Sequence, residues 1–510
     1  MINKNYTNPL IILFLSTLLA FGQKKQNEIK KDKIAANWES MTDNYHVPEW
    51  FQDGKFGVWF HYGIPSSIDE NRPNDGSHYG RRMYGAIDGE KEGQLKMTET
   101  LTEWHVKEYG ELSEFGYEDF IPKFKAENFD ANKLTAYIKS IGAKFIMPVG
   151  THHDNFDMYD SFFEWNSVKM GPKRDFLKEW KLAAEKHDLK FGVSTHLYWS
   201  PRFFATARKY QKKGTPEWDF FNMDYHPKEF AKQDSWNQFW YQRCWDIIQK
   251  YDPDMFNIDS SYPKEKGKDE SGLGLELFAN FINKNLEKNS GKQDVVLSLK
   301  VGPTNKAAFT YNLERGGAAT IKPNPWMWAT DLSGNWFYRK NAINRMTVPV
   351  MIANGVDAIS KNGVVMLNVA LTSDGVIPEK QKKYLSAFKD LFDVNGEGLY
   401  GTRPWKIYGE GPLKIKEGRQ GENHKEFSQK DIRFTTKDGN LYAFVLATPT
   451  EDIIIKTLKK GGKLDKQIKK ISLLGSNETI YWEQNTNELK ITCPKQMPNQ
   501  PIIAFKLLLK

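Results

Sequence analysis

Several short apolar runs in this chain end on a side chain capable of acid–base or hydrogen-bonding chemistry. The clearest case is Asp259, which directly follows the run Met255–Ile258. Other runs end in the same way on His61, His152, His153, His196 and Lys300. Strands of α/β barrels deliver catalytic groups to their carboxyl ends, which meet at one face of the barrel. The pattern therefore predicts one shared active site built from several strand ends.

The carboxylates suggest hydrolysis of a glycosidic bond, which needs two acids flanking that bond. Asp259 supplies one of them. The second must follow another strand, and two acids are suitably placed in the sequence: Glu314, within Leu313–Gly316, and Asp331, within Ala329–Leu332. Either residue could equally be a solvated loop acid, so both remain candidates for the acid/base.

The histidines allow three interpretations. They could be held by backbone groups at strand ends. They could belong to a metal site with His61, His152 and Asp259 as ligands, although a His-x-His pair on one strand is missing. We favour the third, in which His61, His152, His153 and His196 bind sugar hydroxyls, because an imidazole can both donate and accept a hydrogen bond.

Tryptophan is abundant, with 16 residues in the chain. Indole rings of this kind can stack on the C–H faces of a sugar, although most tryptophans of a large barrel lie in its core. Trp326 and Trp336 fall in predicted loops or strand ends and are the candidates for substrate contacts.

The elements that must position these residues alternate between strand and helix. Predicted strands are Phe56–Phe60, Lys144–Val149, Lys190–Ser194, Met255–Ile258, Val295–Leu299 and Val364–Asn368, with a weaker one near Ala318–Ile321. Amphipathic helices are predicted at Ala131–Ile141, Asp175–His187, Ser235–Tyr251, Leu273–Lys288 and Glu379–Asn395. No glycine-rich dinucleotide fingerprint follows a strand, so the alternation favours a closed (β/α)8 TIM-like barrel over an open sheet.

The chain divides into four predicted parts. Residues 1–22 read as a cleaved signal peptide, with a basic start, about a dozen apolar residues and a small-residue exit. Residues 23–50 are a loose polar lead-in, and residues 51–398 form the barrel, with a long insertion at 64–125. Residues 399–510 alternate short apolar runs with turns and predict an antiparallel β-sandwich with a structural rather than a catalytic role.

Composition excludes several classes of protein. A mean hydropathy of -0.64 and 27% charged residues indicate a soluble protein with no membrane association after signal cleavage. The net charge of +8 is spread along the chain without the basic stripe of a nucleic-acid binder. Solvated lysines explain most of this excess of positive charge. The alternative explanation is that the protein acts on an anionic substrate. The two cysteines are too few for a disulfide framework.

Taken together, the motifs resemble glycoside hydrolase family 29, the α-L-fucosidases. The matching segments occur in order over roughly residues 36–510: Trp50–Gly63, Gly142–Ile146, His152–Phe156, Pro172–Asp175, Asp252–Asp259, Leu367–Pro378 and Val394–Trp405. The resemblance implies that Asp259 is the nucleophile of a retaining mechanism and that His61, His152 and His153 hold the sugar. It also implies that no metal or organic cofactor is needed.

Two departures from the family pattern limit what the resemblance implies. The family usually reads Trp-Phe-Asp-Gly at the nucleophile, whereas this chain reads Asn257–Ser260. Many members also carry a Trp-Glu pair as the source of the acid/base, and Met327 or Ala329 stands there instead. Glu314 is therefore the first candidate for the acid/base and Asp331 the second.

These departures keep three functions open. The first is a secreted or periplasmic exo-acting α-L-fucosidase that acts on an oligo- or polysaccharide, which could be sulfated. The second is an α-L-galactosidase or fucan hydrolase on the same scaffold. The third is a carbohydrate-binding protein that lacks the acid/base.

Overall fold

The computed structural model describes residues 33–264, 272–303 and 307–510. The predicted signal peptide, residues 1–22, and the first part of the predicted lead-in lie outside these ranges. Residues Ile34–Lys510 form one compact unit. Within the described ranges, no helix combines the length and the apolar character that crossing a bilayer requires.

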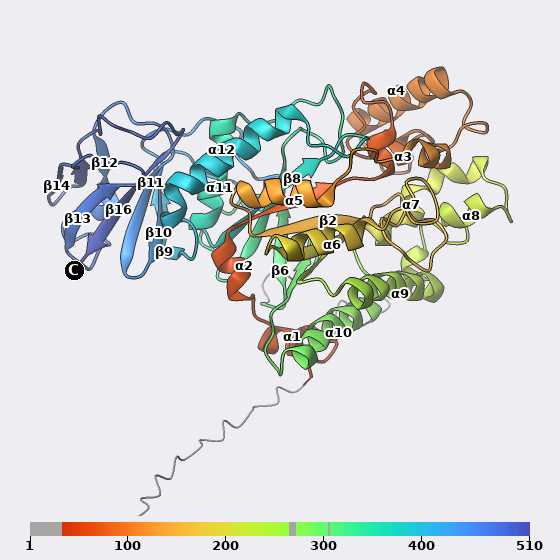
Figure 1. Cartoon of the computed structure of the whole chain (residues 1–510), viewed down its shortest axis with the longest axis horizontal. Coiled ribbons are helices and arrows are strands. Elements are labelled where there is room, and N and C mark those ends of the chain that lie inside the picture. The colour runs from red at the N-terminus through yellow and green to blue at the C-terminus, as the bar shows by residue number, and fades with distance from the viewer. Residues whose placement is uncertain (1–32, 265–271, 304–306) are drawn as a thin grey trace, which may run out of the picture. The chain divides into compact units, whose positions relative to one another are not determined.

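Eight parallel strands close into a barrel in chain order, as the sequence predicts, with β8 hydrogen-bonded to β1. Figure 1 labels β2, β6 and β8 among them. The strands are β1 (Phe56–His61), β2 (Phe145–Thr151), β3 (Lys190–Thr195), β4 (Met255–Ile258), β5 (Val296–Leu299), β6 (Thr310–Glu314), β7 (Trp326–Asp331) and β8 (Gly363–Ala370). Their inward side chains, among them Trp59, Met147, Met255, Met327 and Met366, form a separate buried cluster. This cluster makes the barrel interior a packed core rather than a pore.

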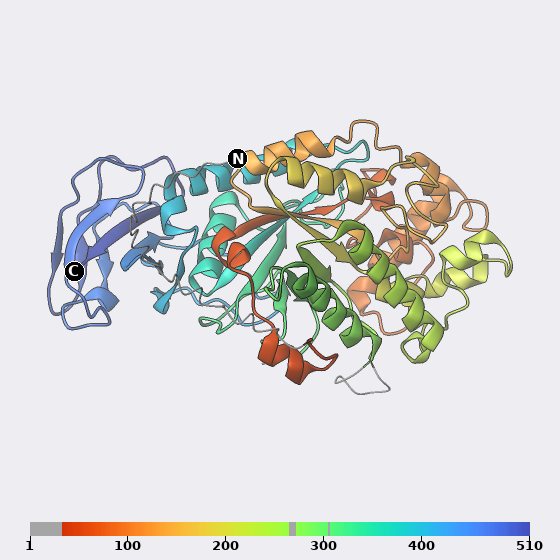
Figure 2. The same ribbon diagram turned by 60° about the horizontal axis from the view of Figure 1, so that its bottom comes forward.

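Helices cover the outside of the barrel, as Figure 2 shows. They are α5 (Ala131–Ser140), α6 (Phe176–Lys186), α9 (Asp234–Tyr251), α10 (Leu273–Lys288), α11 (Val348–Ser360) and α12 (Glu379–Asn395). In α6, Asp175 accepts a hydrogen bond from the Lys178 amide and so caps the helix. Phe176, Trp180 and Ala183 then follow at helical spacing and are buried against the strands.

Four elements of the barrel differ from the sequence prediction. Strand β7 was missed, because Trp326 was assigned to a loop or strand end. The weak strand near Ala318–Ile321 is wrong, because that segment is a loop between β6 and β7. Strand β6 was missed because Thr310 and Asn312 point into the barrel and break the apolar run. Helix α11 was missed because it is buried along most of its length and shows no amphipathic alternation.

The prediction of a loose lead-in at residues 23–50 is also wrong for residues 33–50, which the structure describes. Residues 38–44 form α1 (Trp38–Asn44), and α2 (Glu49–Gly54) follows before β1. The Trp38 ring packs against Tyr262, Phe278 and Phe309, and Met41 is fully buried. From Ile34 onward the chain is therefore part of the barrel core.

Two long insertions lie at the carboxyl ends of the strands. The first, after β1, holds η1 (Ile64–Ser67), α3 (Tyr79–Arg82), α4 (Glu92–Tyr109) and η2 (Tyr117–Lys123). The second, after β3, holds η3 (Leu197–Trp199), α7 (Ser200–Phe203), η4 (Ala205–Tyr210), α8 (Pro216–Phe220) and η5 (Phe230–Lys232). Tyr117 and Phe220 stack between the two insertions, so they form one packed rim.

Antiparallel sheets follow the barrel, as predicted. After η6 (Gly396–Gly398), one sheet has the order β13-β16-β11-β10-β9 and the other has the order β12-β15-β14. Their strands are β9 (Arg403–Glu410), β10 (Ile432–Lys437), β11 (Asn440–Val445), β12 (Ile453–Ile455), β13 (Ile468–Leu473), β14 (Trp482–Gln484), β15 (Leu489–Ile491) and β16 (Ile503–Leu509), with η7 (Lys456–Leu458) after β12. The sheets enclose an apolar core of their own, as a sandwich does.

A buried ion triad joins the sandwich to the barrel. Arg433 on β10 and Lys361 after α11 both contact the Asp357 carboxylate, at 2.5 Å and 2.8 Å. All three side chains are at most 5% exposed. The segment 411–431, between β9 and β10, leaves the sandwich and returns to the barrel, where Gly317 and Gly418 exchange backbone hydrogen bonds of 2.9 Å.

Candidate active site

A cavity of about 490 Å³ opens at the carboxyl ends of the barrel strands. Its lining includes the strand-end residues His61, His152, His153, His196, Asp259, Lys300 and Glu314. The structure therefore brings these separate strand ends together around one cavity. Trp59, an inward side chain of β1, also contributes to the lining. The remaining lining residues lie beyond the strands: Gly76, Ser77, His78, Trp199, Ser260, Ser261, Val301, Arg315, Trp336 and Arg419.

Asp259 is held by one of its two carboxylate oxygens. Its Oδ2 accepts a hydrogen bond from Lys300 Nζ at 3.0 Å and lies 3.2 Å from His196 Nε2. Its Oδ1 is buried and has no hydrogen-bond partner among the described residues. The Asp259 amide donates to Thr195 at 3.0 Å, which fixes the residue just beyond β4. One oxygen is thus oriented by its neighbours and the other is left available.

Glu314 reaches the same cavity from the end of β6. Its Oε2 contacts Lys300 Nζ, so one ammonium group bridges the two carboxylates. The Asp259, Lys300 and Glu314 side chains are 9%, 14% and 13% exposed. Lys300 is therefore screened little by water, and its charge acts strongly on both acids.

The pKa values of the two acids shift in opposite directions, because burial outweighs the Lys300 charge at Asp259 but not at Glu314. Burial raises the pKa of Asp259 to about 6, although Lys300 opposes the rise. Burial would also raise the pKa of Glu314, but the adjacent Lys300 ammonium brings it below its ordinary value. Burial disfavours the Lys300 ammonium, yet the two carboxylates raise the pKa of Lys300 above its usual range.

The histidines line the cavity as neutral groups. His61 Nδ1 lies 2.6 Å from Asn368 Oδ1, and His153 Nδ1 donates to the His196 carbonyl oxygen at 2.8 Å. Burial lowers the pKa of His61 and of His153 to about 3. His152 Nδ1 and His196 Nδ1 are buried without partners among the described residues. Neutral imidazoles with unused nitrogens are suited to binding hydroxyl groups.

The structure does not group the three ligands of the metal hypothesis. The nitrogens of His61, His152 and His196 lie within 4.8 Å of one another, whereas Asp259 is not part of that group. Asp259 contacts the Lys300 ammonium instead. A divalent cation beside Asp259 would be repelled by that ammonium, so the geometry favours hydroxyl binding over metal binding.

Two predicted residues do not reach the cavity. Asp331 is 3% exposed and accepts hydrogen bonds from Arg315 Nε at 2.8 Å and Nη2 at 2.5 Å. Trp326 begins β7, at the opposite end of that strand, and donates to the Lys361 carbonyl oxygen at 3.0 Å. Asp331 therefore acts as the counter-ion of Arg315, and Trp326 lies away from the site.

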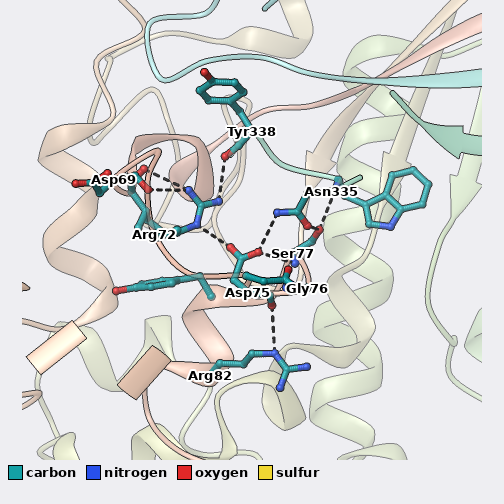
Figure 3. Close-up of polar contacts among 12 residues, drawn as sticks. Asp69, Arg72, Asp75, Gly76, Ser77, Arg82, Asn335 and Tyr338 are labelled. Atoms are coloured by element: carbon teal, nitrogen blue, oxygen red, sulfur yellow. Dashed lines mark hydrogen bonds and ion pairs between the residues drawn. The ribbon is translucent and has the colours of Figure 1, made fainter. Parts of the chain in front are cut away.

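Trp336 does reach the cavity, and a buried network holds the loop that carries it (Figure 3). Asp75 is the centre of this network: it contacts Arg72 Nε at 2.7 Å and accepts from Asn335 Nδ2 and the Ser77 amide, each at 2.9 Å. Arg72 also donates to the Tyr338 carbonyl oxygen at 3.0 Å. The first insertion is thereby joined to the loop after β7.

The same network continues to side chains that line the cavity. Ser77 Oγ accepts from the Trp336 amide at 2.8 Å. The Trp336 carbonyl oxygen accepts from Asn368 Nδ2 at 2.9 Å, and Asn368 in turn contacts His61. The Trp336 ring lies 5.2 Å from the His61 ring, with the Arg315 guanidinium 5.1 Å away. Asp75 thus supports one side of the cavity without lining it.

Sequence reasoning missed the loop residues of the site. Ser77 and His78 come from the first insertion, Arg315 directly follows Glu314, and Arg419 comes from the segment 411–431. Arg419 corrects the expectation that residues 399–510 have only a structural role. The length of the first insertion was the available signal for Ser77 and His78, whereas no periodicity or motif singled out Arg419.

Comparisons with known proteins agree with this architecture. The family model described as α-L-fucosidase matches residues 21–397, and the α-L-fucosidase C-terminal domain model matches residues 424–509. Tissue α-L-fucosidase of Rattus norvegicus is 25% identical over 473 residues, covering 91% of this chain and 89% of its own. Plasma α-L-fucosidase of Homo sapiens is 25% identical over 469 residues, covering 88% and 86%. The crystal structure of Thermotoga maritima α-fucosidase has the same fold, with a TM-score of 0.70 at 24% identity, covering 93% of this chain and 100% of that one.

Proposed function

Because this chain belongs to the α-L-fucosidase family and is a glycosidase, we propose that it releases terminal α-L-fucose from oligo- or polysaccharides by a retaining mechanism. One observation carries this proposal above the others. Asp259 and Glu314 lie in one cavity and contact the same Lys300 ammonium nitrogen. The proposal assigns Asp259 as the nucleophile and Glu314 as the acid/base.

The separation of the two acids supports retention. Two oxygens that contact one nitrogen lie no farther apart than two hydrogen-bond lengths, about 6 Å. Retaining enzymes hold their carboxyl groups about 5–5.5 Å apart, whereas inverting enzymes need about 6.5–9.5 Å to admit a water molecule. The shared contact with Lys300 favours the shorter class.

The contacts of Asp259 suggest which oxygen attacks. Oδ2 is occupied by Lys300 and lies near His196, while Oδ1 has no partner among the described residues. In the first step Oδ1 bonds to the anomeric carbon, the glycosidic bond breaks, and Glu314 gives its proton to the leaving oxygen. In the second step Glu314 takes a proton from water, whose oxygen displaces the Asp259 ester and releases the sugar.

The first step needs the proton on Glu314 and the negative charge on Asp259. In the free site Lys300 favours the ionised form of Glu314. A leaving oxygen that enters between Lys300 and Glu314 separates the carboxylate from its cation. The nearby charge of Asp259 then raises the pKa of Glu314. Substrate binding therefore favours the protonated, reactive form of the acid.

Two other functions were left open by the sequence: a carbohydrate-binding protein, and an α-L-galactosidase or fucan hydrolase. The binding-protein hypothesis rested on a missing acid/base, and Glu314 beside Lys300 supplies a candidate for that group in the cavity. The α-L-galactoside alternative differs only in the sugar accepted, and no described residue of the cavity favours it over fucose. We therefore keep α-L-fucose as the proposed sugar.

The test is replacement of the nucleophile. Asp259→Asn should reduce hydrolysis of an aryl α-L-fucoside by on the order of 10⁴-fold or more, because the attacking carboxylate is lost. The wild-type protein should form a covalent adduct at Asp259 with a 2-fluoro-α-L-fucosyl fluoride, seen by mass spectrometry, and the variant should not. Thermal melting serves as the folding control. Unchanged turnover in a folded variant would remove the proposal.

We also propose that the protein is exported after cleavage of residues 1–22. This rests on the basic start and apolar core of that segment. N-terminal sequencing of the protein recovered from the medium or periplasm should find a start near residue 23. A cell-associated protein that retains Met1 would contradict export.

A further inference from the structure

Arg419 lines the cavity, and the proposed mechanism gives it no role. It comes from the segment 411–431, which leaves the β-sandwich and packs against the end of β6. We infer that Arg419 forms a subsite for an anionic group, a sulfate ester or a carboxylate, on the sugar unit from which fucose is released. This inference rests on the proposed function, because it assigns the leaving-group side of the same cavity.

The backbone on both sides of Arg419 is anchored to the barrel. Gly418 exchanges two hydrogen bonds of 2.9 Å with Gly317, and the Gln420 amide donates to the Glu314 carbonyl oxygen at 3.3 Å. Two residues further on, the Glu422 amide donates to the Arg315 carbonyl oxygen at 3.1 Å. Arg419 is therefore held between two anchored neighbours rather than at the tip of a free loop.

Glycine makes this close approach possible. A Cβ atom on Gly317 would lie 2.5 Å from both the Lys416 carbonyl oxygen and Ile415 Cγ2. A Cβ atom on Gly421 would lie 2.4 Å from the Lys416 carbonyl oxygen. Both contacts are shorter than real side chains tolerate, so the segment packs this tightly only with glycine at both positions.

The anchor also defines the side of the cavity that Arg419 occupies. The amide of its neighbour Gln420 donates to the backbone carbonyl oxygen of Glu314. In the proposed mechanism the Glu314 carboxyl group protonates the leaving oxygen. The histidines that face the released sugar come from the ends of β1, β2 and β3 instead. Arg419 therefore adjoins the leaving group, and its positive charge acts on both Asp259 and Glu314.

The Arg419 guanidinium differs from that of Arg315, which also lines the cavity, because Arg419 has no ion-pair partner among the described residues. Arg315 is paired with Asp331, Arg72 with Asp75, and Arg81 and Arg82 with Glu90. An unpaired guanidinium presents a planar fork that matches the two oxygens of a carboxylate or sulfate. A cation at this position therefore selects for an anion on the substrate.

The test compares pairs of aryl α-L-fucosides whose aglycones are nearly isosteric but differ in charge. One pair is 4-carboxyphenyl and 4-carbamoylphenyl, and the other is 4-sulfophenyl and 4-sulfamoylphenyl. The wild-type protein should show a kcat/KM at least ten-fold higher for the anionic member of one or both pairs, which is the order of one charge-assisted hydrogen bond. The pair with the larger ratio identifies carboxylate or sulfate as the preferred group.

Arg419→Gln should reduce this ratio to near one, and Arg419→Lys should leave an intermediate ratio because the charge remains but the fork is lost. Lys416→Gln is the matched control: this exposed residue lies on the same segment outside the cavity lining and should keep the wild-type ratio. Added salt should lower the wild-type ratio.

The outcomes separate the two proposals. A wild-type ratio near one with brisk hydrolysis of the neutral fucosides would overturn the subsite alone. A ratio that survives in Arg419→Gln would do the same. No hydrolysis of any aryl fucoside by the wild-type protein would count against the proposed function instead.

Discussion

The two walls of the cavity use opposite chemistry. The histidine wall, formed by His61, His152, His153 and His196, comes from the first three strands and consists of buried neutral rings. The charged wall, formed by Asp259, Lys300, Glu314 and Arg419, comes from β4, β5, β6 and the segment 411–431. Strand order around the barrel therefore separates groups suited to recognition from groups suited to reaction.

Burial has different consequences on the two walls. On the histidine wall it lowers the pKa values, so the rings stay uncharged and their hydrogen-bond roles do not change with mild acid. On the charged wall, burial raises the pKa of Asp259 and Lys300 counteracts the same effect on Glu314. The same desolvation thus stabilises one wall as a constant binding surface and makes the other responsive to pH.

The largest expected loss of activity in this comparison comes from replacing Glu314, the proposed acid/base of the charged wall. Glu314→Ala should lower kcat/KM by about 10²–10⁴-fold for a fucoside with a poor leaving group, because protonation of that group is lost. An activated aryl fucoside should lose less, and azide should restore turnover as fucosyl azide. The measurement is steady-state kinetics with product analysis.

Asp331→Asn is the matched comparison for Glu314→Ala. It removes the charge that pairs with Arg315 but should show neither the dependence on leaving group nor azide rescue. If these two signatures appeared in Asp331→Asn and not in Glu314→Ala, the acid/base assignment would have to move to Asp331.

The next prediction concerns the support of the histidine wall. Asp75→Ala leaves the Arg72 guanidinium, which is 0% exposed, without its partner. Removing one partner of a buried ion pair costs about 3–5 kcal/mol, so the free energy of unfolding should fall by that order. Chemical denaturation measures this loss.

A double variant separates stability from positioning in the same network. Arg72→Met with Asp75→Leu should recover much of the lost stability, since an apolar pair can replace a buried ion pair. It cannot restore the bonds to Ser77 and Asn335, so KM should stay raised while kcat changes less. A KM equal to that of the wild type in this variant would contradict a positioning role for Asp75.

A smaller effect is expected when one member of the histidine wall is replaced. His153 donates through Nδ1 to the His196 carbonyl oxygen, which leaves Nε2 free to accept from a sugar hydroxyl. His153→Leu should raise KM about 10–100-fold, the cost of one unmade buried hydrogen bond, with a smaller change in kcat. His187→Leu, on a helix end where the ring contacts Asn132, is the control and should stay within about two-fold.

The smallest effect is a shift in pH dependence on the charged wall. Asp259 must be ionised to attack, so kcat/KM should rise with pH through an apparent pKa near 6. Lys300→Met removes a cation that favours the ionised form, so the acidic limb should move to higher pH by about one unit. Lys178→Met at an exposed position should leave the limb in place. A limb that moved to lower pH would contradict the assigned role of Lys300.

Much of the barrel could be predicted because its signals are local. Apolar runs such as Met255–Ile258 are continuous since both faces of a parallel barrel strand are buried. The amphipathic stripe of α6 similarly reports one buried face. The pattern failed at β6, β7 and α11. At β6, polar inward side chains break the apolar run, and at α11, burial on all sides removes the amphipathic alternation.

The sequence by itself determined the strand-end groups, because each of them follows its own strand directly and needs no distant partner to be recognised. The choice between Glu314 and Asp331 rested on tertiary contacts, since both end neighbouring strands and differ only in whether Lys300 or Arg315 meets them. Ser77, Trp336 and Arg419 likewise depend on loops that pack together from distant parts of the chain. Spacing along a chain reports local geometry, whereas the contacts between loops arise only when the barrel closes and the sandwich docks against it.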